Sequence, residues 1–402
     1  MIPSIQSLAD QPGRAAGTAI QTGSADIMTS APETAAAKPI DWRKRIMAQA
    51  MKSAGAGTWV SPAVKPPFPF DELIYDWNVR LPRDEGFRLY LQTGFATGDE
   101  SPWLYAGHWG VVKPMAGKRD NPKFDCGEVD QDHLKLTAAA LTCRFKVVSE
   151  GDKPLTTLPS IGLIATITTP TAAHRGGKVP RSSAPRAPPS ETTTILDIPL
   201  RAQEDTNGYH LKDRCQSAAL ASAMEYFGKS VPLEHIICYT TDPEYRSFGI
   251  WPRTINTAVE HGFRAYLDRF RDWDSVRATV AQNKVILCSI TMPEKDSYIA
   301  PPYKRMDGHI VALNGVTPDG RVVVTDSALV KDGRGRLLQW LIPDFEKIWM
   351  RNKGGVGMVI CPPPGAKMRL VDNLPPFPRP IRAQTTETLE TTAGDDKTTA
   401  PK

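Results

Sequence analysis

The chain has 402 residues, of which 41% are hydrophobic and 23% charged, enough for roughly two or three domains with packed cores. Its 49 basic and 44 acidic residues leave a net charge of +5, which is too small to favour nucleic acid as a partner. The longest apolar run, 161–167, is too short for a transmembrane segment. Six cysteines without a CxxC pair argue against a disulfide scaffold or a zinc ribbon, and no metal or organic cofactor is implied.

Residues 1–67 are expected to be a disordered or linker region, because they are rich in small and polar residues and end in a proline-rich run. Within this region a short basic helix is predicted over 41–54, since Trp42, Ile46 and Ala50 recur on one helical face. A solvated helix is favoured over one that docks or lies on a membrane surface. The start of the chain lacks the basic and apolar stretches of a secretory signal peptide, so none is expected.

Residues 68–168 predict an all-β domain, a sandwich resembling a jelly roll. Short segments alternate large apolar and polar residues, most clearly at 87–92, and turn residues separate them. Trp103, Tyr105 and Trp109 belong to one such segment. Their aromatic faces suit either core packing or carbohydrate binding, and core packing is favoured.

The run at 169–194 is rich in proline and poor in residues to bury, which marks a linker. Helical and strand patterns mix over 195–364, which indicates a separate α+β domain. A disordered tail is expected over 365–402. Whether Cys126 and Cys143 form a disulfide is left open by the sequence.

A cysteine precedes an Ala-rich helical pattern in the second domain. The helix is predicted over 217–227 and Gly228 is a natural stop, so Cys215 lies at the helix N-terminus. Free backbone N–H groups and the helix dipole favour a thiolate there, and a thiolate is a competent nucleophile. The alternative is a small buried cysteine. Cys238 and Cys288 have apolar neighbours and are interpreted as core residues.

A predicted β-hairpin supplies a histidine and a carboxylate. His309 enters its first strand, a turn follows at 317–320, and Asp326 leaves its second strand. Because the two strands pair antiparallel, both side chains are expected at the same end of the ladder, where a carboxylate can orient an imidazole. Taken singly, a strand-edge histidine and a turn aspartate are the simpler interpretations. Their joint placement behind Cys215 favours a Cys-His-Asp triad.

Several segments together resemble the bacteriocin-processing (double-glycine leader) cysteine peptidase-like family of the papain-like group, in its stand-alone bacterial type with an N-terminal β-sandwich. The segments that carry the resemblance are Ile198-Pro199 with Gln203, the helix after Cys215, 248–267, 307–328, Phe345 with Trp349 and Gly354-Gly355, and, in the first domain, 70–82 and 101–110. The resemblance implies a papain-like α+β peptidase domain. It also suggests export, without which a cytoplasmic location would be expected.

Carried over residue by residue, the resemblance implies Cys215 as nucleophile, His309 as base and Asp326 as the orienting carboxylate. It implies Gln203 as an oxyanion-hole donor, acting together with the backbone N–H of Cys215. Members of the family often have proline shortly after the cysteine and after the aspartate, and this chain departs from that pattern. Gln216, which follows the cysteine here, is a second candidate for the oxyanion site.

The function expected from these residues is hydrolysis of peptide or other amide bonds through an acyl-enzyme, with a peptide or an amide-containing polymer as substrate. Transfer to an amine in place of water uses the same residues. The alternative is a binding or structural protein with a retired peptidase domain, whose β-sandwich binds carbohydrate or another cell-envelope polymer. An intact Cys, His and Asp set argues against retirement.

Overall fold

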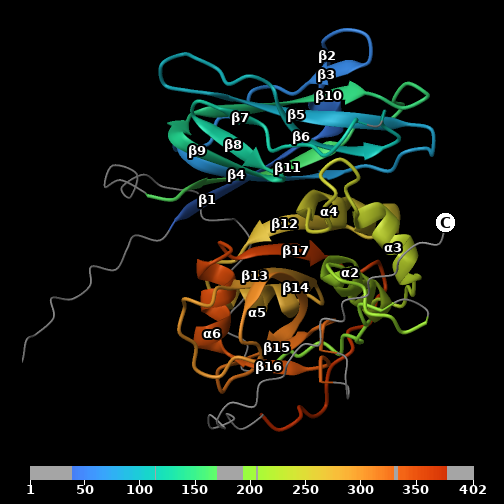
Figure 1. Ribbon diagram of the computed structural model, residues 1–402, viewed down its shortest axis with the longest axis vertical. Coiled ribbons are helices and arrows are strands. Elements are labelled where there is room, and N and C mark those ends of the chain that lie inside the picture. Colours follow the sequence, from blue (N-terminus) through green and yellow to red (C-terminus); the bar gives the residue numbers. More distant parts are fainter. Residues whose placement is uncertain (1–38, 114, 170–192, 205–206, 330–333, 378–402) are drawn as a thin grey trace, which may run out of the picture. The chain divides into compact units, whose positions relative to one another are not determined.

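The computed structural model describes residues 39–113, 115–169, 193–204, 207–329 and 334–377 (Figure 1). The disorder predicted for 1–38, nearly all of the predicted linker and the end of the tail therefore lie outside the described residues. Within the described ranges, no helix is long and apolar enough to cross a membrane.

The N-terminal domain consists of two antiparallel sheets. The first has the order β1 (Ile40–Ile46), β11 (Ser160–Ile167), β4 (Phe70–Asn78), β9 (His133–Ala140), β8 (Gly127–Asp130) and β7 (Lys123–Phe124). The second has the order β2 (Lys52–Ser53), β3 (Thr58–Val60), β10 (Thr142–Ser149), β5 (Gly86–Gly94) and β6 (Leu104–Gly110). A short 3-10 helix, η1 (Ala48–Ala50), lies between β1 and β2.

The two sheets enclose a common hydrophobic core, which makes this domain a β-sandwich. Tyr75 of β4 meets Phe145 of β10 edge to face at 5.9 Å between ring centroids, so the contact joins the two sheets. Trp77 of β4 and Phe87 of β5 make a second such contact at 6.3 Å. The alternation that predicted the strands therefore corresponds to side chains that fill the space between the sheets.

The helix predicted over 41–54 is wrong, because its first half is strand β1, paired antiparallel with β11. Trp42 and Ile46 are four residues apart, a spacing that suits one face of a strand as well as one face of a helix. Both side chains contact the sandwich core. Arg43 and Arg45, on the opposite face of β1, pair with the carboxylates of Asp268 and Asp76. The sandwich therefore begins at β1, well before residue 68.

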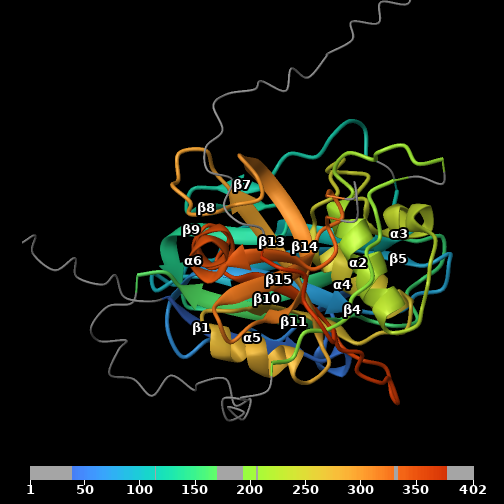
Figure 2. The same cartoon turned by 90° about the horizontal axis from the view of Figure 1, so that it is seen from below.

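The C-terminal domain is a six-stranded antiparallel sheet with helices. Its strands have the order β12 (Ala265–Arg269), β17 (Val356–Ile360), β13 (Val285–Met292), β14 (Met306–Val316), β15 (Arg321–Thr325) and β16 (Leu338–Leu341), and Figure 2 shows β13, β14 and β15 side by side. Its helices are α2 (Cys215–Tyr226), α3 (Leu233–Thr240), α4 (Trp251–Glu260), α5 (Trp273–Val280), α6 (Ile342–Glu346) and the π-helical turn η3 (Lys347–Arg351). The expected α+β class is confirmed.

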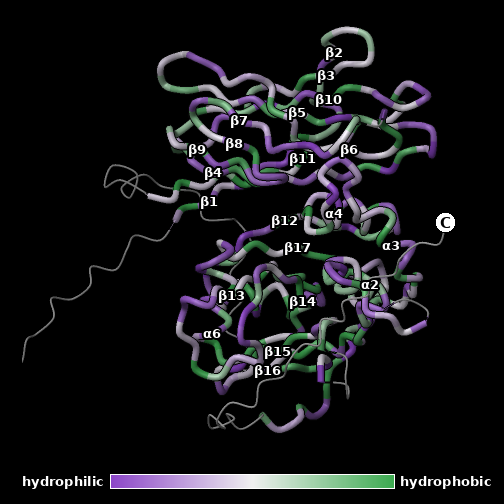
Figure 3. The backbone as a smooth tube through the Cα atoms, in the orientation of Figure 1, coloured by the Kyte–Doolittle hydropathy of each residue, from purple (hydrophilic) through white to green (hydrophobic). Residues whose placement is uncertain are grey.

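Helix α2 is the central helix of this domain and packs against β14. Its run of small and apolar residues is buried on nearly all sides, and Gly228 follows it with a positive φ of +85°, which glycine adopts without strain. The strands of the sheet are apolar as well; β17, which lies against α4, is mostly green in the hydropathy colouring of Figure 3. Burial on every side fixes the position of the helix, and with it the position of Cys215 at its first turn.

The sandwich packs directly against the C-terminal domain. Ile74 of β4 and Ile164 of β11 belong to the core cluster of the C-terminal domain, and α4 lies on β4. Tyr105 packs with Tyr245, and the Trp109 ring stacks on Tyr239 at 5.9 Å. Tyr105 and Trp109 are both 3% exposed, so neither ring offers a free face for a carbohydrate.

Part of the predicted disordered tail is ordered. Leu370 pairs with Leu196, and the backbone N–H of Arg369 donates to the Tyr226 hydroxyl at 3.1 Å. The Gln339 side chain donates to the carbonyl of Pro375 at 2.6 Å. These contacts compensate for the low apolar content from which disorder was predicted. Cys126 and Cys143 are both free thiols in the described structure.

Candidate active site

The hairpin of β14 and β15 brings His309 and Asp326 together. Ala312 lies opposite Thr325, so the start of β14 and the residue after β15 share one end of the ladder. The Nε2 atom of His309 lies 2.7 Å from Oδ1 of Asp326. Both side chains are buried, which strengthens a hydrogen bond between charged groups.

Asp326 accepts two further hydrogen bonds. The Tyr303 hydroxyl donates to Oδ2 at 2.7 Å, and the backbone N–H of Ala328 donates to Oδ1 at 2.9 Å. Burial alone raises the pKa of a carboxyl group, but the charge of His309 and these hydrogen bonds outweigh it and lower the pKa of Asp326. The carboxylate is therefore held ionised beside the imidazole.

Cys215 is the first residue of α2 and its side chain is partly exposed. Its thiol lies close enough to the His309 ring to contribute to the raised pKa of the imidazole. Because Nε2 of the ring is bonded to Asp326, the Nδ1 atom is the one left for Cys215. Burial lowers the pKa of His309, but the Asp326 carboxylate and Cys215 raise it to about 10. The imidazole is thus stabilised as a cation beside the Asp326 carboxylate.

The two glutamines considered for the oxyanion site lie in different surroundings. The backbone N–H of Gln203 donates to the carbonyl of Ser327, which follows Asp326. Its side-chain Oε1 is buried without a hydrogen-bond partner among the described residues. The Gln216 amide instead donates to the carbonyl of Ile250, so it is not free to reach an oxyanion. This bond argues against an oxyanion role for the Gln216 side chain.

A cleft of about 760 Å³ opens beside Cys215 and His309. Both domains line it. The sandwich contributes residues of β4, of the turn at 130–133 and of β11 and its end, and the C-terminal domain contributes the loop 246–249 and the turn 351–354. The reacting groups therefore face a groove whose opposite wall belongs to the other domain.

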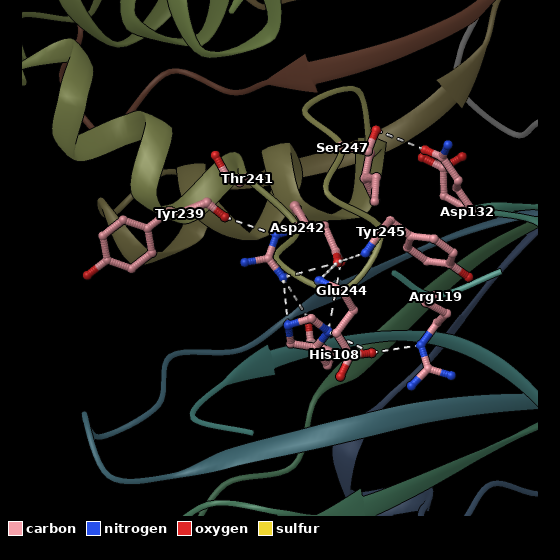
Figure 4. A network of polar contacts seen from close by, with 12 residues as sticks. His108, Arg119, Asp132, Tyr239, Thr241, Asp242, Glu244, Tyr245 and Ser247 are labelled. Carbon is pink, nitrogen blue, oxygen red and sulfur yellow. Dashed lines mark hydrogen bonds and ion pairs between the residues drawn. The ribbon is translucent and has the colours of Figure 1, made fainter. Parts of the chain in front are cut away.

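A buried ionic network holds the loop that lines this cleft. Glu244 accepts from Arg119 at 2.7 Å (Figure 4) and from Arg88 at 2.5 Å, and both arginines belong to the sandwich. Asp242 accepts the backbone N–H groups of Glu244 and Tyr245 at 2.9 Å each, which fixes the local turn. Figure 4 also shows His108 against this cluster. The sandwich therefore sets the conformation of a loop next to Cys215.

The structure changes the interpretation of one cysteine and adds two features of the site that the sequence analysis did not find. Cys288 is buried as expected, but Cys238 is exposed, because it lies on the outer face of the short helix α3. Tyr303 was missed by the sequence analysis: it lies in an irregular segment before β14, where no periodicity marks it. The contribution of Asp132 and its neighbours was missed too, since only the packing of the two domains brings this turn to the cleft.

Comparison with protein families covers both domains. Residues 195–355 match the model of the Peptidase C39-like family, and residues 6–165 match that of the Peptidase C39 N-terminal domain. The C-terminal part of the chain is thus a domain of the cysteine peptidase class. Within that class it belongs to the Peptidase C39-like family, which confirms the resemblance noted in the sequence. A separate comparison with curated proteins finds no match.

Solved structures similar to the chain include three peptidase domains. One is the peptidase domain of Streptococcus ComA, a bifunctional ABC transporter, with 13% identity over 41% of this chain and 98% of that chain and a TM-score of 0.29. Another is a double glycine motif protease from an AMS/PCAT transporter. It shares 15% identity with this chain, the match covers 43% of this chain and 96% of that chain, and the TM-score is 0.27. The third is a C39-like peptidase from Bacillus anthracis. It shares 14% identity with this chain, the match covers 42% of this chain and 98% of that chain, and the TM-score is 0.33.

Proposed function

We propose that this protein is a cysteine peptidase that hydrolyses peptide or related amide bonds through Cys215, His309 and Asp326. The observation that carries the proposal is the 2.7 Å contact between Asp326 and Nε2 of His309, with Cys215 at the start of α2 close enough to the same ring to affect its pKa. Membership of the C39-like family supports a peptide as the substrate.

In the proposed reaction, Cys215 and His309 form a thiolate–imidazolium pair. The high pKa of His309 favours this pair, because the proton rests on the ring while the sulfur carries the negative charge. The thiolate attacks the carbonyl carbon, and the C–N bond of the tetrahedral intermediate breaks as His309 gives its proton to the leaving amine. Water, deprotonated by the now neutral ring, then attacks the thioester carbonyl, and the C–S bond breaks, which releases the acid product and restores the thiolate–imidazolium pair.

The developing oxyanion requires hydrogen-bond donors. As the first residue of α2, Cys215 has a backbone N–H without a partner inside the helix, and it is the first proposed donor. The side-chain amide of Gln203 is the second. Its backbone is anchored beside Asp326, through the bond from its N–H to the carbonyl of Ser327.

The test uses the full-length chain with Cys238→Ser as background, because the exposed Cys238 would otherwise react as well. A defined mixture of synthetic peptides is incubated with the protein, and the products are identified by mass spectrometry. We expect cleavage by the parent and a loss of several orders of magnitude in Cys215→Ser, since a hydroxyl ionises far less readily than a thiol. Cleavage by Cys215→Ser at the parent rate would refute the mechanism.

Alkylation of Cys215 by iodoacetamide gives a readout that needs no substrate. We expect rapid labelling of Cys215 near neutral pH and slower labelling in His309→Ala, because that change removes the partner of the thiolate. The binding-protein alternative predicts no cleavage and equal labelling in the two variants. Two of the three aromatic residues on which that alternative relied for carbohydrate binding, Tyr105 and Trp109, are buried, and Trp103 is partly buried.

A further inference from the structure

Four neighbouring strands connect the candidate active site to a charged region at the same edge of the sheet. His309 of β14 lies opposite Ile290 of β13, β13 pairs with β17, and Val356 of β17 lies opposite Arg269 of β12. Adjacent strands are about 4.8 Å apart, so three steps separate the strand of Arg269 from that of His309 by about 14 Å. An extended peptide covers that distance with about four residues, at about 3.3 Å each.

Arg269 is a buried cation that lines the cleft. It is 5% exposed, and its Nη1 lies 2.7 Å from Oε2 of Glu72 in the sandwich. Its Nε atom is buried without a hydrogen-bond partner among the described residues. A methyl group on Gly354 would lie 3.3 Å from Nη1 of Arg269 and 3.9 Å from Nη1 of Arg271, so both guanidinium groups approach this turn. A donor left unpaired in such a place is costly unless a ligand accepts from it.

The residues around the cleft leave an excess of positive charge. Six basic and four acidic residues line it: Lys135, Arg246, Arg269, Arg271, Arg351 and Lys353, against Glu72, Asp130, Asp132 and Asp213. Burial raises the pKa of Asp132 to about 7, so that carboxyl is only partly ionised at neutral pH. Lys135 and Arg269 are paired within the cleft, to Asp130 and Glu72. Arg271 is paired to Asp41 beside it.

Two further cations lack such partners. Lys353 and Arg246 form no ion pair in the part of the chain that the structure describes, although the charge of Lys353 acts on the Asp132 carboxyl and offsets part of the rise in its pKa. Lys353 belongs to the turn that carries Gly354, and its side chain is only partly exposed. A partly desolvated ammonium group gains more from a carboxylate partner than a fully exposed one. Lys353 is therefore the first candidate to bind an anionic group.

The backbone around the cleft is also unusual. Of the five non-glycine residues with positive φ in the described structure, three line the cleft: Gln131, Asp213 and Arg246, at +59°, +60° and +51°. Such conformations cost free energy and gather at binding sites, where packing holds them. Gln131 of the sandwich is held across the domain boundary, because its Oε1 accepts from the Ser247 hydroxyl at 3.2 Å.

We propose that this end of the cleft is a binding subsite, formed by both domains, for an acidic side chain of the peptide substrate about four residues from the bond that is cut. The proposal rests on the proposed peptidase function and specifies its substrate. Lys353 and Arg269 receive the carboxylate, and the turn around Gln131 closes the site from the side of the sandwich. The N-terminal domain thereby takes part in substrate selection.

The experiment is the digestion of a defined mixture of synthetic peptides by full-length protein, with all cleavage sites read by mass spectrometry. The parent is expected to favour Asp or Glu about four residues to one side of the cut bond. In Lys353→Gln this preference should fall roughly threefold to tenfold in relative kcat/KM, as expected for one partly buried ion pair. In Lys353→Glu it should turn toward Lys or Arg. Lys295→Gln removes an exposed charge that does not line the cleft and should leave the preference unchanged.

The possible results separate the two proposals. If no peptide is cleaved and Cys215 is not preferentially alkylated, the peptidase function fails. If peptides are cleaved without an acidic preference, or if the preference survives in Lys353→Glu, the subsite is refuted while the peptidase function stands. Lys353 lines the cleft and, unlike Arg269, makes no buried ion pair that the fold depends on. Its variants therefore test the subsite even if Arg269→Gln fails to fold.

Discussion

The Tyr303 hydroxyl and the His309 ring bind opposite oxygens of the Asp326 carboxylate, each at 2.7 Å. Tyr303 also stacks on Trp340 at 6.3 Å between ring centroids, which fixes its ring. Burial and the charge of Asp326 raise the pKa of Tyr303 far above its usual value, so the hydroxyl keeps its proton and donates it. Tyr303 is therefore a positioning residue for the imidazole.

Tyr303→Phe is expected to lower kcat/KM for peptide cleavage by roughly threefold to thirtyfold, because one hydrogen bond to a charged group is lost. Without that bond the pKa of Asp326 rises, so the acid limb of the pH–rate profile should move to higher pH. Tyr298→Phe, which removes a hydroxyl bonded to Asp296 in the same irregular segment, is the control and should leave the profile unchanged. A profile identical in the two variants would exclude positioning by Tyr303.

Gln203→Ala tests the second proposed oxyanion donor. If its amide serves the oxyanion, kcat should fall by about 10²–10³-fold with little change in the melting temperature. Gln216→Ala should show the reverse pattern, since its buried amide bonds to the carbonyl of Ile250 and supports the packing of α4. Rates and thermal unfolding measured on the two variants decide the point. A Gln203→Ala variant with the parent rate would leave the backbone N–H of Cys215 as the sole proposed donor.

The elements that could be predicted from the sequence are those determined by residues close together in the chain. The Ala-rich helix behind Cys215 and the hairpin that joins His309 to Asp326 follow from periodicity and turn residues within one short segment. Strand β1 was misread because the spacing of Trp42 and Ile46 fits two periodicities, and only pairing with the distant β11 decides between them.

The parts of the site that depend on distant partners were not predictable. Tyr303 has no sequence pattern of its own, and its role appears only when the fold brings Asp326 to it. Likewise, Glu244 reads as a solvated residue until Arg88 and Arg119 of the other domain are placed around it. One sequence without its fold carries no record of such long-range pairs.

The His309–Asp326 pair predicts how stability depends on pH. The pKa of His309 is raised from its ordinary 6.5 to about 10, so the folded state binds this proton more tightly than the unfolded chain. The resulting stabilisation is complete below pH 6.5 and is lost as the pH rises through about 10. The difference in the free energy of unfolding between the parent and His309→Gln, measured in urea, should therefore shrink over that range.

His261 provides a control of opposite sign. Burial lowers its pKa, so the unfolded chain binds that proton more tightly. Its contribution should raise stability as the pH increases toward 6.5, and His261→Gln should remove this slope. A parent–variant difference that grows between pH 6.5 and 10 for His309→Gln would contradict the assignment of its raised pKa.

The last prediction concerns the ionic contact that joins the sandwich to the loop beside Cys215. Glu244 has a side chain 4% exposed and is bonded to Arg88 and Arg119, so Glu244→Gln leaves buried guanidinium charge without its partner. Such a loss costs about 3–5 kcal/mol, whereas Glu100→Gln, which breaks the exposed pair with Arg144, should cost about 0–1 kcal/mol. Urea denaturation of the two variants measures both costs. Because the same loop lines the cleft, Glu244→Gln should also raise KM for peptides more than it lowers kcat. Equal and small costs for the two variants would show that the network does not hold the domains together.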